Sequence, residues 1–125
     1  MRYVYIFTPK MRMIDTPDKG RGVVALQHIS RGEILEQATS FVLSKNVKPR
    51  GAIAKYMYEY EFKGSTYYVA VLGFGMLYNH SKEHQNVVCG VDRLTGIWTY
   101  FAARNIARGE ELLIEYNNAE FNEPS

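Results

Sequence analysis

Short β-prone runs fill this chain, and each run is bounded by residues that favour turns. The runs are rich in Val, Ile, Tyr and Phe, and Gly, Asn, Asp and Ser separate them, as is typical of strands. A long stretch with the 3.6-residue periodicity of an amphipathic helix is absent from the sequence. The pattern predicts a mainly β protein. It disfavours a doubly wound α/β sheet, in which helices would alternate with strands.

Two pairs of runs have the spacing of β-hairpins. Tyr56–Phe62 and Thr66–Leu72 flank the turn Lys63-Gly64-Ser65, and residues 87–91 and 97–103 flank a second turn at 92–96. Residues 52–55 are predicted to form a short helical turn before the first hairpin. The other expected strands cover residues 3–7, 22–26, 33–36, 40–43 and 112–116.

Length and composition limit what the chain can be. The 125 residues fit one domain over 1–125, and 46% hydrophobic with 22% charged residues argues against disorder. The single cysteine, Cys89, allows neither an internal disulfide nor a Cys-rich zinc site, so we expect no bound metal. No apolar run reaches ~20 residues and no secretory leader is recognisable, so we expect an intracellular protein that binds no membrane. The choice between nucleus and cytoplasm stays open. A net charge of +2 does not favour direct nucleic-acid binding.

The sequence contains one internal echo. Ile29-Ser30-Arg31-Gly32-Glu33 matches Ile106-Ala107-Arg108-Gly109-Glu110, and each copy precedes an apolar run. Glycine in each copy suits a tight turn. The echo therefore predicts two similar turns.

Three segments carry residues suited to chemistry. They are Gly20-Arg21-Gly22, Asn79-His80-Ser81 at the end of a glycine-rich stretch, and Gly109 through Tyr116. Two glycines around one residue allow a ligand to approach the backbone closely, and Asn, His and Ser offer both donors and acceptors. His28 and His84 have no metal-ligand spacing to His80, and no nucleophile elbow surrounds Ser81. Each segment alone has a structural explanation as a turn or a core position.

In this order, the three segments resemble the motifs of the SET-domain protein lysine methyltransferases. The resemblance covers residues 12–121. The short chain is similar to the small stand-alone members of bacteria and large viruses. It implies a β-clip-like SET-domain fold with several small antiparallel sheets. In that fold the carboxy-terminal segment threads beneath a preceding loop. It also implies transfer of a methyl group from S-adenosyl-L-methionine to a lysine amine of a protein.

The resemblance assigns roles to particular residues. Tyr116 is the expected catalytic residue, because its hydroxyl would hold the methyl at the transfer point. Tyrosine rings are the expected walls of the channel that would hold the substrate lysine. The expected cofactor-binding residues are Gly20, Arg21, Gly22, Asn79, His80 and Phe121, and the expected channel residues are Tyr56, Tyr58, Tyr78 and Ile114.

The sequence departs from the family pattern at three places, one of which is Glu115, where Asp or Asn is common. Residues 82–86 replace a shorter, proline-containing run, and Ile114 stands where many members have Phe or Tyr. Because isoleucine has no hydroxyl to hold a blocking water, Ile114 predicts di- or trimethylation. The resemblance also implies histone modification in chromatin, with a histone tail or another host protein as substrate, and the missing flanking segments predict a homodimer.

Two alternatives remain open from the sequence. One is a catalytically inactive SET-like module that binds a peptide or the cofactor. The other is a structural β protein that merely echoes the three motifs.

Overall fold

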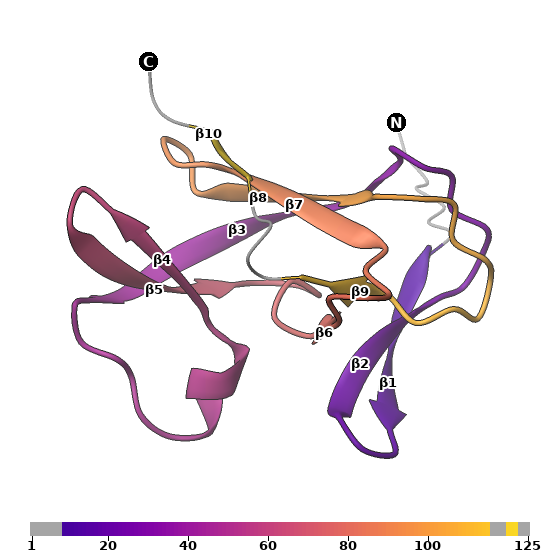
Figure 1. The fold of residues 1–125 in the computed structure, drawn as a ribbon, viewed down its shortest axis with the longest axis horizontal. Coiled ribbons are helices and arrows are strands. Elements are labelled where there is room, and N and C mark those ends of the chain that lie inside the picture. The colour runs from indigo at the N-terminus through magenta and orange to yellow at the C-terminus, as the bar shows by residue number, and fades with distance from the viewer. Residues whose placement is uncertain (1–8, 116–119, 123–125) are drawn as a thin grey trace, which may run out of the picture.

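The computed structural model describes residues 9–115 and 120–122, and its secondary structure is almost entirely β (Figure 1). This confirms the predicted fold class. Among the described residues, no helix has the length and apolar character that crossing a membrane requires. The elements are β1 (Met11–Thr16), β2 (Gly20–Ala25), β3 (Ile34–Lys45), the 3₁₀-helix η1 (Ala52–Tyr56), β4 (Tyr58–Phe62), β5 (Ser65–Val71), β6 (Asn79–His80), β7 (Val87–Asp92), β8 (Ile97–Ala102), β9 (Leu113–Ile114) and β10 (Glu120–Asn122).

Hydrogen bonds join the described strands into two sheets. β1 and β2 form an antiparallel two-stranded sheet, and the others form an eight-stranded sheet in the order β4-β5-β3-β8-β7-β9-β6, with β10 beside β7. Figure 1 shows β4 and β5 at one side of the molecule and the β1–β2 hairpin at the other, with β6 and β9 between them. The second and third motif segments thus lie in the middle of the molecule, and the first opens β2 at one side of it.

Both predicted hairpins are confirmed, and the helical turn is confirmed as η1. At the first hairpin turn Lys63 and Gly64 both have positive φ, of 49° and 80°, as a tight two-residue turn requires. The expected strand at 112–116 is present as β9, and the expected strand at 3–7 lies outside the described residues. β1, β6 and β10 were not predicted, because polar or very short segments give no strand pattern of their own.

The prediction of two separate strands at 33–36 and 40–43 is wrong. Residues 34–45 form one continuous strand, β3, which pairs with β8 through its first half and with β5 through its second half. Ala38 is buried opposite Trp98, so a position with weak strand propensity is held by its neighbour. Register shifts at 34/36 and 42/44 bend this strand between its two partners.

The hydrophobic core lies beneath β8. Trp98, Tyr100 and Ala102 alternate inward along this strand and are 2% exposed or less. The Trp98 ring packs against Tyr58 of β4, with 4.6 Å between ring centroids. Several tyrosines of this Tyr-rich chain therefore belong to the core.

The internal echo corresponds to two equivalent turns that pack against each other. Ile29 and Ile106 are both fully buried and exchange two backbone hydrogen bonds, of 2.9 and 2.8 Å. In each turn the final glutamate, Glu33 or Glu110, accepts a hydrogen bond from the backbone N–H three residues earlier. The pair of turns fixes the start of β3 relative to the segment that leads into β9.

The carboxy-terminal segment passes beneath a loop, as the resemblance implied. β9 pairs in parallel with β6 on one side and with β7 on the other, while residues 81–86 connect β6 to β7. Ser81 N donates to Ile114 O and Asn86 N donates to Leu113 O, so the loop is bonded to the strand that it crosses. This crossing is rare among protein folds, and it sets the position of the site.

Candidate active site

The three motif segments meet around β9. Leu112 N donates to Val23 O at 2.8 Å, which joins the third segment to the first. Asn79 pairs with Leu113, which joins the third segment to the second. The third segment is thus hydrogen-bonded to strands that carry each of the other two segments.

Gly22 lies where the three segments are closest. A Cβ atom at this position would lie 2.7 Å from Asn79 Nδ2 and 2.8 Å from Glu111 Oε2, closer than real Cβ contacts allow. Asn79 Nδ2 itself donates to Glu111 Oε2 at 2.8 Å. The missing side chain of Gly22 makes room for this hydrogen bond, whereas the adjacent Gly20 is required for its positive φ of 76°.

Asn86 holds the crossing together. Its side chain is fully buried, and Nδ2 donates to Glu110 Oε2 at 3.0 Å and to Glu111 O at 2.9 Å. Its Oδ1 accepts from Leu113 N at 2.7 Å. Three hydrogen bonds satisfy the buried amide and tie the loop to the threaded strand.

Arg104 and Asn86 stabilise the charge of Glu110. Arg104 forms an ion pair with Glu110 at 2.8 Å. Partial burial raises the pKa of Glu110, but the hydrogen bonds from Asn86, Arg104 and the backbone of Ala107 outweigh it, so the pKa lies below its usual value. Glu110 therefore remains an ionised anchor of the crossing.

A cavity of about 110 Å³ opens beside Asn79. Cationic side chains of Lys19, Arg21 and Lys55 line it, and an adjoining cavity of about 330 Å³ shares Arg21 and Tyr56 with it. The second cavity is mostly apolar, with Val71, Leu72 and Gly73 on its wall. The two adjoining cavities together offer cations and an amide at one end and an apolar surface at the other. The residues that line both cavities are Arg21, Tyr56, Met76 and Leu77.

The structure brings six of the predicted site residues to this region. Arg21, Tyr56, Tyr78 and Asn79 line the cavities, Gly22 contacts Asn79, and Gly20 opens the strand that carries Arg21. His80 is exposed at the end of β6 and pairs with Ile114. Ile114 is fully buried in β9 between β6 and β7.

Two of the predicted channel tyrosines are core residues. Tyr58 is 5% exposed and donates to Gly75 O at 2.6 Å, and Tyr100 donates to the Tyr58 hydroxyl at 3.1 Å. Tyr78 is 1% exposed and donates to Glu36 Oε1 at 2.7 Å. Both rings support the glycine-rich loop at 73–78, and Tyr78 also forms part of the wall of the smaller cavity.

Burial controls the titration of this tyrosine network. Desolvation raises the pKa of Tyr78 far above its usual value, and the neighbouring Glu36 raises it further. Burial also raises the pKa of Glu36, against the hydrogen bonds from Tyr78 and Phe74 N. Tyr78 is thus a structural donor near neutral pH and cannot serve as a base.

Two predicted residues cannot be placed. Tyr116 lies outside the described residues. Phe121 belongs to β10, which pairs in parallel with β7 opposite Val91, but its side chain is likewise outside the description. Their roles remain predictions.

The sequence did not point to several residues of this region. Glu111 lies within the third motif segment but had no role of its own, and Glu36 stands in an ordinary polar position. Only the fold brings Glu111 to Asn79 and Glu36 to Tyr78. Lys19 and Lys55 flank predicted elements and carry no motif signal. Their contribution depends on how η1 packs toward β2, which sequence spacing does not encode.

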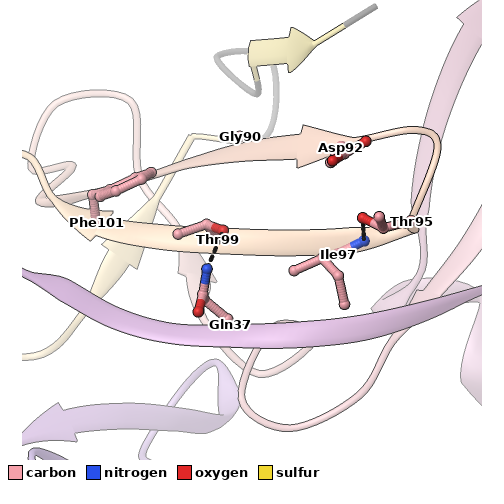
Figure 2. Close-up of a pocket in the computed structure, with 7 residues that line it drawn as sticks. All are labelled: Gln37, Gly90, Asp92, Thr95, Ile97, Thr99 and Phe101. Carbon is pink, nitrogen blue, oxygen red and sulfur yellow. Dashed lines mark hydrogen bonds between the residues drawn. The ribbon is translucent and has the colours of Figure 1, made fainter. Parts of the chain in front are cut away.

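Another cavity, of about 410 Å³, lies away from the motifs on the face of the large sheet (Figure 2). Gln37, Thr99 and Phe101 line it from neighbouring strands, and Gln37 Nε2 donates to Thr99 Oγ1 at 3.4 Å. None of the predicted site residues is among its lining residues. The candidate site is therefore placed at the cavities beside Asn79, which residues of the first and second motif segments line.

Acidic, histidine and cysteine side chains do not gather into a metal-binding group of three or more within the part of the chain that the structure describes.

Comparison with known proteins identifies the family. The family model of the SET domain matches residues 20–117, which include all three motif segments. The chain therefore belongs to the SET-domain family of protein-lysine N-methyltransferases. A structural β protein that merely echoes the motifs is excluded.

Relatives are similar over most of the chain. A Schizosaccharomyces pombe protein named histone-lysine N-methyltransferase, H3 lysine-37 specific, is 31% identical over 119 residues, which cover 94% of this chain and 80% of that protein. A Plasmodium falciparum protein, solved as a candidate histone methyltransferase, is 28% identical with a TM-score of 0.64 and coverage of 88% and 95%. The methyltransferase domain of human PR domain-containing protein 2 has the same TM-score at 20% identity, with coverage of 95% and 81%, and this likeness shows the fold alone.

The contact at Gly22 leads to a prediction about stability. Gly22→Ala should destabilise the fold by about 1–3 kcal/mol, because the new Cβ displaces the Asn79–Glu111 pair. In a protein that already carries Glu111→Ala, one of the two close contacts is gone. The destabilisation caused by Gly22→Ala should therefore be smaller there by about 0.5 kcal/mol or more. Urea unfolding of the four proteins measures this coupling.

Gly20→Ala is the matched control for this experiment. No atom lies within 4 Å of a Cβ at Gly20, so its cost comes from backbone strain alone and should add to that of Glu111→Ala. Strict additivity for Gly22→Ala and Glu111→Ala as well would contradict the proposed contact.

Proposed function

We propose that this protein transfers methyl groups from S-adenosyl-L-methionine to a lysine amine of a histone tail or another host protein. The observation that carries this proposal is the meeting of the three motif segments at Gly22, Asn79 and Glu111, beside a cavity lined by cations. SET methyltransferases use S-adenosylmethionine as a family property. The proposal extends this property to the residues of this chain.

The side chains of the site fit the methionine end of the cofactor. Lys19, Arg21 and Lys55 suit a carboxylate, and the Asn79 amide oxygen suits an ammonium group. The apolar wall of the adjoining cavity, with Tyr56 at the junction, suits an aromatic base. When bound, the cofactor supplies an electrophilic methyl on a sulfonium sulfur and leaves as a thioether.

The protein's part in the reaction is to desolvate and align the amine. Free lysine has a pKa near ~10.4, and an apolar channel next to a cationic sulfonium disfavours the ammonium form. A neutral amine held about 3–3.5 Å from the methyl carbon and in line with its bond to sulfur would be placed for transfer, and the methylated ammonium would release its proton to water. A dedicated general base is not required.

Tyr116 is proposed to hold the transfer point. It follows Ile114 by two residues, so covalent geometry keeps its Cα within about 7–8 Å of the end of β9. A phenol there can line the channel with its ring and contact the polarised methyl with its oxygen through C–H···O interactions. The site residues proposed alongside it are those predicted from the sequence except Tyr58, which is a core residue.

Charge at one edge of the sheet supports a basic substrate. β4 pairs with β5 alone among the described strands, and Glu59 and Glu61 of β4 are exposed. An edge strand with two carboxylates is complementary to a lysine- and arginine-rich peptide. This complementarity agrees with a histone tail as the leading substrate.

Tyr116→Phe tests the catalytic assignment. The variant should bind S-adenosylhomocysteine like the wild type but lose about tenfold or more in turnover, because the oxygen acts only in the transition state. Calorimetry measures binding, and transfer of a labelled methyl group to histones or a whole lysate measures turnover. Tyr68→Phe, on a half-buried tyrosine of β5 outside the proposed site, is the control. Full activity of Tyr116→Phe would remove its assigned role, and wild-type binding without any transfer would favour the inactive module.

Ile114 leads to a prediction about the product. Because isoleucine offers no hydroxyl to retain a water where the next methyl must enter, di- and trimethyl lysine should accumulate. Mass spectrometry of a fully reacted peptide checks this prediction, and Ile114→Tyr should shift the product toward monomethyl lysine. An exclusively monomethylated product of the wild type would contradict it.

A homodimer is also part of the proposal. Exposed apolar side chains lie on and beside β3, among them Phe41, Val42 and Leu43, which are 47–56% exposed. A second subunit could cover such an exposed apolar face. Light scattering at assay concentration should give twice the mass of 14.4 kDa, and a monomeric mass would contradict the proposal.

A further inference from the structure

We infer that Glu111 is a positioning residue that fixes the orientation of the Asn79 amide, so that the amide oxygen is presented to the ammonium group of the cofactor. The inference rests on the proposed function and gives a role to Glu111, which lies in the third motif segment and had no role assigned from the sequence. Glu111 is half-buried, and its Oε2 lies 2.8 Å from Asn79 Nδ2.

The chemistry of the pair removes one of the two amide orientations. An ionised carboxylate only accepts hydrogen bonds, whereas an amide has one accepting end and one donating end. Only Nδ2 of Asn79 can therefore face Glu111. Rotation of the amide by 180° would place its oxygen against a carboxylate oxygen, which is repulsive. Oδ1 is thereby left as the amide atom that a ligand in the adjacent cavity can engage.

The backbone holds both partners of the pair in place. Asn79 pairs with Leu113 of β9, and Glu111 forms a bridge with Val24 of β2. Gly22 packs directly against both polar atoms. The backbones that carry the two side chains are thus fixed, and their hydrogen bond orients the amide.

An oriented acceptor distinguishes ligands by one group. The homocysteine end of S-adenosylhomocysteine carries an ammonium, which donates to an amide oxygen but would be repelled by an amide NH₂. A cofactor analogue that lacks this α-amino group makes no such bond. Loss of Glu111 should therefore weaken only the ligand that carries the amine.

Calorimetry with these two ligands tests the inference. Glu111→Ala should weaken S-adenosylhomocysteine binding by about tenfold or more, because a hydrogen bond to a charged group is lost. Binding of the analogue without the amino group should change by less than about twofold, since it does not use the amide oxygen. Glu33→Gln is the control. It removes a carboxylate that is ion-paired with Lys10 in a turn away from the cavities, so both affinities should be unchanged.

A charge-swapped pair provides a second test with little change of shape. Asn79→Asp alone places two carboxylates in contact and should weaken S-adenosylhomocysteine binding by about tenfold or more. Adding Glu111→Gln supplies an amide donor to the new aspartate and leaves its second oxygen for the ammonium. The double variant should return to within about threefold of the wild-type affinity.

The outcomes separate this inference from the proposed function. If the wild type does not bind S-adenosylhomocysteine, the proposed function fails and the inference with it. If the wild type binds but Glu111→Ala weakens both ligands equally, or the double variant is no better than Asn79→Asp, the positioning role is wrong while the proposed function stands. Selective weakening together with rescue supports the role.

Discussion

The site depends on one constraint, the passage of β9 between β6 and β7 beneath the loop that joins them. Asn86 maintains this crossing with three hydrogen bonds from a side chain that has no exposed surface. A buried amide whose polar atoms are all hydrogen-bonded stabilises the crossing. Each buried donor or acceptor left without a hydrogen bond would cost about 1–3 kcal/mol. The position of every other site residue follows from this crossing.

The crossing explains why small and polar residues gather where a core would ordinarily be apolar. Gly22 must lack a side chain because the Asn79–Glu111 hydrogen bond occupies that space. The cations at Lys19, Arg21 and Lys55 stand around the same point and prepare it for an anionic group. The result is a rigid polar centre whose donors and acceptors are oriented in advance, as an alignment mechanism requires.

The abundant tyrosines serve two purposes. Tyr58, Tyr78 and Tyr100 are buried and hydrogen-bonded around the glycine-rich loop, where each ring fills the core while its hydroxyl satisfies a polar group. Tyr56 instead stands at the junction of the two cavities. Tyr78 belongs to both groups, because it is buried and also forms part of the wall of the smaller cavity.

The sequence by itself determined the fold class, both hairpins, η1 and the three motifs, because these depend on local propensity, turn chemistry and residue order. It did not determine the continuity of β3, because Ala38 lies in a strand only through its pairing with Trp98. It did not indicate Glu111, Glu36 or the lysines of the cavity either, since each gains its role from a partner distant in the chain. Tertiary structure decided which residues meet, because the crossing of β9 joins distant segments through backbone hydrogen bonds that no local pattern records.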